Sequence, residues 1–141
     1  MILLDTNVIS EPLKPQGNPV VLAWIDAQAV ETLYLSSITL AELRFGISIM
    51  PDGKRKDNLR QQLNERVMPV FADRILSFGI EAADAYAELR ARARSVGQAI
   101  GTADAYIAAV AAAHGFAVAT RDASPFQAAG LSVINPWEAI Q

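Results

Sequence analysis

The sequence contains no cysteine and only one histidine, His114. The lack of cysteine excludes disulfide bonds, thiolate metal sites and a cysteine nucleophile, and it suits a reducing compartment such as the cytoplasm. Long hydrophobic runs are also missing. The longest, over residues 105–113, is mostly alanine and far shorter than the roughly 20 residues of a membrane-spanning helix. The opening residues lack a basic segment and a long apolar run, so we expect no secretory leader and a cytoplasmic protein.

Several familiar enzyme motifs are absent too. There is no G-x-S-x-G sequence and no serine–histidine pair at a suitable spacing, so serine nucleophile chemistry has no support. No G-x-x-x-x-G-K-[ST] loop occurs, which removes the usual sign of nucleotide hydrolysis. The only histidine precedes Gly115 at a predicted helix end, where it is expected to complement the helix dipole rather than to bind a metal.

The net charge of −3 does not by itself indicate a polyanion partner, but the basic residues are unevenly distributed. They gather in two stretches: Arg44, Lys54, Arg55, Lys56, Arg60 and Arg66 in the first, and Arg90, Arg92 and Arg94 in the second. These stretches are either solvated helix faces or basic rims that hold phosphates beside an acidic site, which would otherwise repel them.

Hydrophobic patterning predicts an α/β fold in a single domain, residues 1–141. Short apolar runs predict strands over residues 2–4, 33–36, 116–120 and 131–134. Helices are predicted over residues 19–28, 37–50, 54–67, 73–95 and 102–114, with residues 70–71 as a short apolar link. Short buried strands separated by helices indicate a mainly parallel sheet flanked by helices on both faces. Ligand sites in such sheets lie beyond the carboxyl ends of the strands.

Four carboxylates fall near these expected junctions: Asp5 directly after the first strand, Glu42 and Asp104 in early turns of helices, and Asp122 just after the third strand. Each has a structural explanation. Asp5 and Asp122 fit helix or turn caps, the T-x-x-E pattern ending in Glu42 fits a capping box, and Asp104 complements a helix dipole.

Together, however, the four carboxylates indicate a cation site. Burying several carboxylates at one place is costly unless a cation compensates them, and like charges raise one another's pKa. With only oxygen ligands and no cysteine, Mg²⁺ or Mn²⁺ is favoured over zinc.

Five segments, in order and nearly end to end, carry a family resemblance: MILLDTNVIS, SSITLAELRFGI, a glycine-led ADAYIAAVAAAHG, VATRD followed by a phenylalanine, and INPW. The individual segments are short and weak. As an ordered set over one domain of this size, they resemble the PIN-domain family. More closely they resemble the VapC-type toxins of bacterial toxin–antitoxin pairs, and within those the FitB-like group.

The resemblance implies a small PIN fold that acts as a divalent-metal-dependent ribonuclease, with Mg²⁺ as the cofactor and Mn²⁺ as a substitute. It implies an acidic site of Asp5, Glu42 and Asp104 with Asp122 as fourth acid, and polar neighbours Thr6, Asn7 and Thr120. It also implies a homodimer inhibited by a cognate antitoxin, whose own DNA-binding part represses the operon. Many relatives carry T-R-N with an acid three residues later. Here the stretch is TRDASPF, which places the acid at residue 122 and proline at the later position.

The mechanism we expect is phosphodiester hydrolysis with one or two metal ions. Asp5 and Asp104 are expected to be direct ligands, Glu42 a ligand or a water-orienting base, and Asp122 part of a second, weaker position. Two arginines are candidates for RNA contact: Arg44, and Arg121, which either contacts phosphate or pairs with a neighbouring acid. Both tryptophans, residues 24 and 137, are expected to pack in the core or an interface.

Two alternatives compete with this hypothesis. One is a catalytically silent PIN-fold module that acts with an antitoxin in DNA-bound regulation, and the presence of all four acids argues against it. The other is a receiver-type α/β protein. That class needs an acidic pair after the first strand and a lysine near the last, whereas Thr6 follows Asp5 and no lysine occurs after Lys56.

Overall fold

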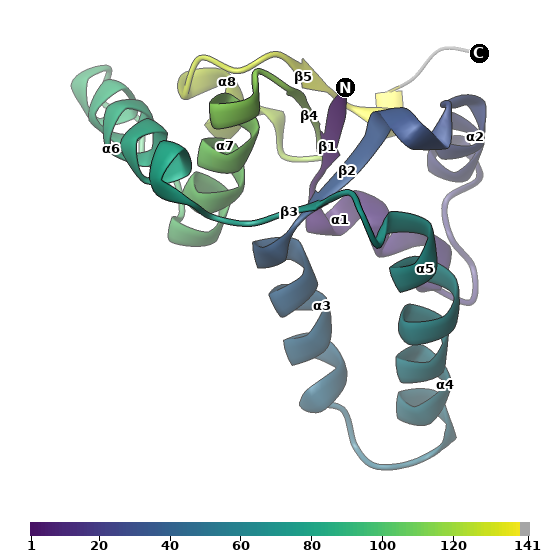
Figure 1. Cartoon of the computed structure of the whole chain (residues 1–141). Coiled ribbons are helices and arrows are strands. Elements are labelled where there is room, and N and C mark those ends of the chain that lie inside the picture. Colours follow the sequence, from purple (N-terminus) through teal and green to yellow (C-terminus); the bar gives the residue numbers. More distant parts are fainter. Residues whose placement is uncertain (139–141) are drawn as a thin grey trace.

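A computed structural model describes residues 1–138, so the last three residues of the predicted domain lie outside it. A five-stranded sheet in the order β3-β2-β1-β4-β5, with every pair parallel, forms its centre (Figure 1). The strands are β1 (Ile2–Leu4), β2 (Leu33–Ser36), β3 (Ile75–Leu76), β4 (Ala117–Ala119) and β5 (Val133–Ile134). The predicted class, a short parallel sheet flanked by helices, is confirmed.

Helices fill the connections between the strands. Between β1 and β2 lie α1 (Thr6–Ile9), the 3₁₀ turn η1 (Glu11–Leu13), α2 (Pro19–Ala27) and the 3₁₀ turn η2 (Val30–Thr32). After β2 come α3 (Ser37–Ser48), α4 (Lys54–Gln62), a π-helical turn η3 (Leu63–Val67) and α5 (Met68–Phe71). After β3 come α6 (Ile80–Ser95), α7 (Thr102–His114), α8 (Ala123–Ala128) and the 3₁₀ turn η4 (Pro136–Glu138). Among residues 1–138, no helix combines the length and the hydropathy that crossing a bilayer requires.

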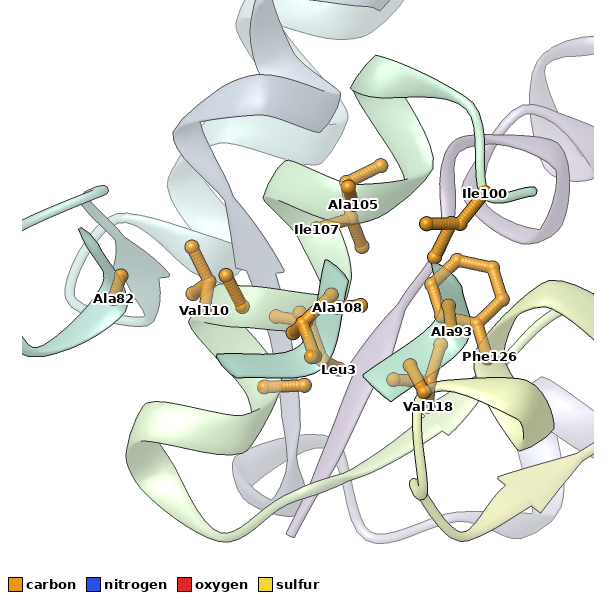
Figure 2. Packing of buried hydrophobic residues seen from close by; sticks show 14 residues of the cluster. Leu3, Ala82, Ala93, Ile100, Ala105, Ile107, Ala108, Val110, Val118 and Phe126 are labelled. Carbon is orange, nitrogen blue, oxygen red and sulfur yellow. The ribbon is translucent and has the colours of Figure 1, made fainter. Parts of the chain in front are cut away.

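The central strand is buried on both faces, because consecutive side chains of β1 enter two separate cores. Leu3 belongs to a core built with α6, α7 and α8, which includes Val118 of β4 and Phe126 (Figure 2). Leu4 points to the other face and packs with residues of α1 to α5, among them Val8 and Leu63. Each layer of helices therefore packs on β1 through its own hydrophobic core.

Small side chains allow α7 to pack closely in the first of these cores. Ala105, Ala108, Ala109 and Ala111 are all fully buried in this core, where Figure 2 shows Ala105 and Ala108. Gly115 then ends the helix with φ 70°, a left-handed conformation that glycine adopts without strain. The histidine before it lies at the end of α7 away from the acids, with Nδ1 3.0 Å from the carbonyl oxygen of Val110. This position fits its expected role as a helix-end residue.

The structure corrects the prediction of a long helix over residues 73–95. Ile75 and Leu76 instead form β3, which pairs with β2, and the helix α6 begins only at Ile80. The side chain of Arg74 stabilises this arrangement by donating hydrogen bonds to the carbonyl oxygens of Leu33 (3.0 Å) and Val70 (2.7 Å). The arginine thus joins the new edge strand to β2, a long-range contact that helical periodicity does not reveal.

A second correction concerns residues 63–71, where the sequence predicted a helix end followed by a link. The chain stays helical to Phe71 but widens to a π turn at Leu63–Val67, where the Met68 amide bonds the Leu63 carbonyl five residues back. Pro69 explains the widening, because proline lacks an amide hydrogen and clashes with the carbonyl four residues before it. The helix α8 was also absent from the predicted set of helices.

The order of the strands fixes where a site can form. The chain runs outward from β1 to β2 and β3, and then returns to place β4 and β5 on the other side of β1. The carboxyl ends of β1 and β4 therefore lie side by side at a topological switch point, the usual place of a binding crevice in open parallel sheets. Asp5 follows β1 there, and Thr120 follows β4.

Candidate functional site

Asp5 is the most deeply buried acid of the candidate site, with 4% of its surface exposed. Its amide donates to the Ala119 carbonyl (2.9 Å), so the ladder between β1 and β4 fixes its backbone. One carboxylate oxygen accepts from the Thr6 amide (2.8 Å), which caps α1, and the other accepts from the Thr120 hydroxyl (2.7 Å). The capping role considered from the sequence is thus real. Each carboxylate oxygen can still accept a further bond, so the group remains able to bind a ligand at the switch point.

Burial raises the pKa of Asp5 from its ordinary value of 3.8 to about 6. The hydrogen bonds from Thr120 and from the Thr6 amide oppose this rise, while the charges of Asp104 and Glu42 add to it. A nearby positive charge would therefore stabilise the ionised form of Asp5 and lower its pKa.

Glu42 is tied to Asp5 through the residue next to it in sequence. The Thr6 hydroxyl donates to Oε1 of Glu42 (2.6 Å) and lies 3.3 Å from the hydroxyl of Thr39. The capping-box interpretation of Thr39 and Glu42 is wrong. Helix α3 begins earlier, at Ser37, and its cap is Ser36, whose side chain accepts from the Thr39 amide (3.1 Å). Glu42 is therefore free of the cap and exposed on the helix side that faces α1.

Thr39 is a site residue that sequence reasoning missed in this role. It is fully buried, and its hydroxyl lies 3.3 Å from the hydroxyls of both Ser36 and Thr6. These hydroxyls connect the carboxyl end of β2 to that of β1, so Thr39 positions the threonine that holds Glu42. The signal was present in the spacing, because residues three apart on a helix lie on one face and a buried threonine needs a partner.

Asp104 enters from α7 at the same end of the sheet. It is half-buried in the first turn of the helix, where Gly101 is so close that a Cβ there would lie 3.9 Å from Oδ2 of Asp104. Burial raises the pKa of this carboxyl, and the charges of Asp122 and Glu42 raise it further. Asp104 thus links the predicted acids, since its charge acts on Asp5 and it is itself close enough to be repelled by Asp122 and Glu42.

Thr120 and Asp122 come from the segment after β4. Thr120 is fully buried, and besides donating to Asp5 its hydroxyl accepts from the Asp122 amide (3.1 Å). Asp122 precedes α8 but makes no side-chain cap bond there, and its side chain is exposed. The cap interpretation of Asp122 thus fails at the side chain, which remains available to the site.

Asn7 and Arg121 complete the polar surroundings. The side-chain oxygen of Asn7 accepts from the Arg121 amide (3.3 Å), and its amide group lies 3.5 Å from both Asp5 and Thr120. The Arg121 guanidinium lies over the ring of Trp137, 5.2 Å from its centre. Neither Arg121 nor Arg44 belongs to an ion pair in the described chain, so the alternative that Arg121 pairs with a neighbouring acid has no support there. Contact of either arginine with RNA stays a prediction.

The donor chemistry of this edge fits a hard divalent cation. All candidate ligands are carboxylate oxygens, two of them have raised pKa values, and their mutual repulsion is what a cation would relieve. Within residues 1–138, no three acidic or histidine side chains are already gathered tightly enough to hold an ion. The side chains thus share one edge of the sheet as a loosely spaced set, in which Asp5 is buried, Asp104 is half-buried, and Glu42 and Asp122 are exposed.

As a test of the role predicted for Asp5, we expect Thr120→Val to lower the rate of RNA cleavage by about 10- to 100-fold, the usual effect of losing a group that orients a metal ligand. Valine keeps the shape of threonine but removes the hydrogen bond that opposes the raised pKa of Asp5. The pH at which activity reaches half its maximum should therefore rise. A pH–rate profile measures this shift, and Thr32→Val, which loses a threonine hydroxyl far from the acids, is the control. An unchanged profile in Thr120→Val would contradict the role given to its hydroxyl.

An all-parallel sheet with carboxylates at its switch point defines a small α/β protein with an acidic site. Residues 2–131 match the family model described as "PIN domain". The chain therefore belongs to the PIN-domain family, as the sequence motifs indicated.

Three relatives align over almost their whole length. The plasmid stability protein StbB of Pseudomonas syringae pv. tomato is 64% identical, over 99% of this chain and 100% of its own. The VapC ribonuclease Y4jK of Sinorhizobium fredii is 59% identical over 98% and 99%. The toxin FitB of Neisseria gonorrhoeae is 51% identical over 97% and 99%.

Solved structures agree with this assignment. The crystal structure of FitAcB from Neisseria gonorrhoeae contains a chain that is 50% identical and superposes with a TM-score of 0.95, covering 99% of this chain and 100% of that one. The structure of FitAB bound to an IR36 DNA fragment gives the same TM-score at 48% identity, over 100% and 99%.

Proposed function

We propose that this chain is a divalent-metal-dependent endoribonuclease and the toxin of a toxin–antitoxin pair. The observation that carries the proposal is the buried Asp5 at the switch point, with a pKa raised to about 6 and with Asp104 and Glu42 near enough to repel it. Such an arrangement is costly as a set of anions, and a cation among them would offset that cost. Relatives named VapC ribonuclease and toxin FitB support the same assignment.

The cation that these residues would hold, Mg²⁺ or Mn²⁺, would supply Lewis-acid chemistry when bound: it would lower the pKa of a water and offset charge on the scissile phosphate. Asp5 and Asp104 would hold the ion, and Glu42, oriented by Thr6, would bind it or accept the proton of the attacking water. The exposed Asp122 would contribute to a second, weaker position. Thr120 and Asn7 keep Asp5 in place while the phosphate approaches.

The partners we propose follow from the names of the relatives. FitAcB and FitAB are complexes, and FitAB is bound to DNA. For this chain we infer a cognate antitoxin that inhibits it, DNA contact only through that antitoxin, and a homodimer as the active unit.

The test is cleavage of a structured RNA by the purified chain freed of any partner protein. We expect cleavage with Mg²⁺ or Mn²⁺, complete loss of cleavage in EDTA, and recovery when the metal is restored in excess. The reason is that the carboxylates and the phosphate are both anions, so a cation is needed between them. Gel analysis of end-labelled RNA measures each step. If the protein is inert on every RNA but binds its antitoxin tightly, the silent binding module is the correct function.

A further inference from the structure

The three arginines near the end of α6 do not share one surface. Arg90 and Arg94, one helical turn apart, line a cavity of about 570 Å³ between the end of α6 and residues 97–100. Arg92 lines a different cavity, near the amino ends of the strands, and its guanidinium occupies the space that a Cβ at Gly130 would fill. The helix thus places Arg90 and Arg94 on one surface and Arg92 on another, although the three are close in sequence.

The cavity of Arg90 and Arg94 is connected to the acidic site by one short loop. Helices α6 and α7 pack closely along each other and are joined by residues 96–101, so the end of α6 adjoins the start of α7. Ile100 lines the cavity and is itself buried in the core, which anchors the loop (Figure 2). The next residue, Gly101, is the one that borders the Asp104 carboxylate. One short loop therefore separates the two arginines from a proposed metal ligand.

The chemistry of the cavity suits an anion. The residues that line it include two arginines and no acid. Arg90 is held in place by Tyr86, whose hydroxyl accepts from Nη1 (2.7 Å) and whose ring centre lies 5.5 Å from the guanidinium carbon. Tyr86 in turn stacks on Tyr106 of α7, with ring centres 4.8 Å apart. The guanidinium is thus positioned before any ligand arrives, which lowers the entropic cost of binding.

We propose that Arg90 and Arg94 bind backbone phosphates of the single-stranded RNA next to the one that is cut, a proposal that rests on the proposed nuclease function. A site made of four carboxylates repels the substrate backbone, and a neighbouring pair of cations offsets this repulsion. Arginine suits the task because its planar donors match phosphate oxygens. The pair determines affinity for RNA longer than the cleaved step, whereas the acids perform the chemistry.

The experiment compares Arg90→Gln/Arg94→Gln with Arg92→Gln, which removes a charge from the same helix turn on a different surface. On an RNA of ten or more nucleotides, we expect the double variant to raise KM about tenfold at unchanged kcat. Two lost phosphate contacts should also lower the slope of log(kcat/KM) against log salt by about 1.4, at about 0.7 for each contact. Arg92→Gln should leave both quantities near wild type.

A dinucleotide that contains only the cleaved phosphate separates this role from a structural one. We expect wild type and the double variant to cleave it equally, because it cannot reach the arginines. If Arg94 only complements the dipole at the end of α6, thermal stability falls and the salt slope does not, which overturns the proposal. An equal KM and salt slope on long RNA overturns it too, while the nuclease assignment stands. If wild type cleaves no RNA, the nuclease assignment itself fails.

Discussion

We expect Asp104→Asn to lower the rate of RNA cleavage by more than about 100-fold without unfolding the protein. Loss of groups that only orient a metal ligand costs about 10- to 100-fold, and a direct ligand should cost more. The folded state should be as stable as wild type or more so, since the pKa of Asp104 is raised by burial and by the charges of Asp122 and Glu42. Single-turnover cleavage and thermal denaturation in EDTA measure the two effects.

Controls make the Asp104 experiment specific. Asp26→Asn makes the same change on an exposed carboxylate of α2 and should alter neither quantity. Asp122→Asn should have an intermediate effect, because its carboxylate is exposed and lies at the edge of the set. A variant Asp104→Asn that cleaves like wild type would remove this residue from the metal site. A variant that is inactive because its melting transition is lost would assign it a structural role instead.

The second large effect concerns stability and pH in the absence of divalent metal. The pKa of Asp5 is about 6 in the folded chain against an ordinary 3.8, so between these values the folded state binds a proton that the unfolded state has lost. The stabilisation is therefore complete below about pH 4 and disappears as pH rises through 6. At 1.36 kcal/mol for each pKa unit, the free energy of unfolding should fall by roughly 3 kcal/mol.

Urea denaturation in EDTA at pH values from 4 to 7.5 measures this fall. The relevant quantity is the difference between wild type and Asp5→Asn, because all other titrating groups are common to both. The amide has no proton to lose, so the variant should lack the Asp5 contribution. Mg²⁺ should restore stability to wild type at pH 7, where the ionised form binds it, and not to the variant. A difference that does not change with pH would contradict the raised pKa of Asp5.

The buried centre of the sheet was predictable from the sequence because it depends on local pattern. Ile2–Leu4 followed by Asp5 is an apolar run ending in an acid, and such a run in an α/β chain predicts a strand that points its acid at the sheet edge. The alanine-rich α7 and its glycine end are equally local. The strand β3 was not predictable in this way, since two residues carry no periodicity and Arg74 holds them through carbonyls 4 and 41 residues away.

In the candidate site, too, some features follow from local sequence pattern and others depend on long-range contacts. The positions of its four predicted acids in the fold could be read from the sequence, because Asp5 and Asp122 depend on where strands end and Glu42 and Asp104 on where helices begin. The spacing of Ser36 and Thr39 carried a local signal, but the contact between the hydroxyls of Thr39 and Thr6 could not be predicted, since it joins side chains 33 residues apart. The separation of Arg92 from its two neighbours also depends on which surfaces of α6 face the loop and the sheet.

The pairing of β1 with β4 also governs when the site comes into existence. The bond between Thr120 and Asp5 spans 115 residues, and the strand that carries Thr120 is the neighbour that completes the central sheet. During synthesis from the amino terminus, Asp5 is made early, whereas Thr120, which hydrogen-bonds to it, is made only after most of the chain. Such distant parallel pairing forms late and slowly. A truncated or still-growing chain that lacks β4 therefore carries Asp5 without the hydroxyl that holds it, so the site would be complete only in the nearly finished protein.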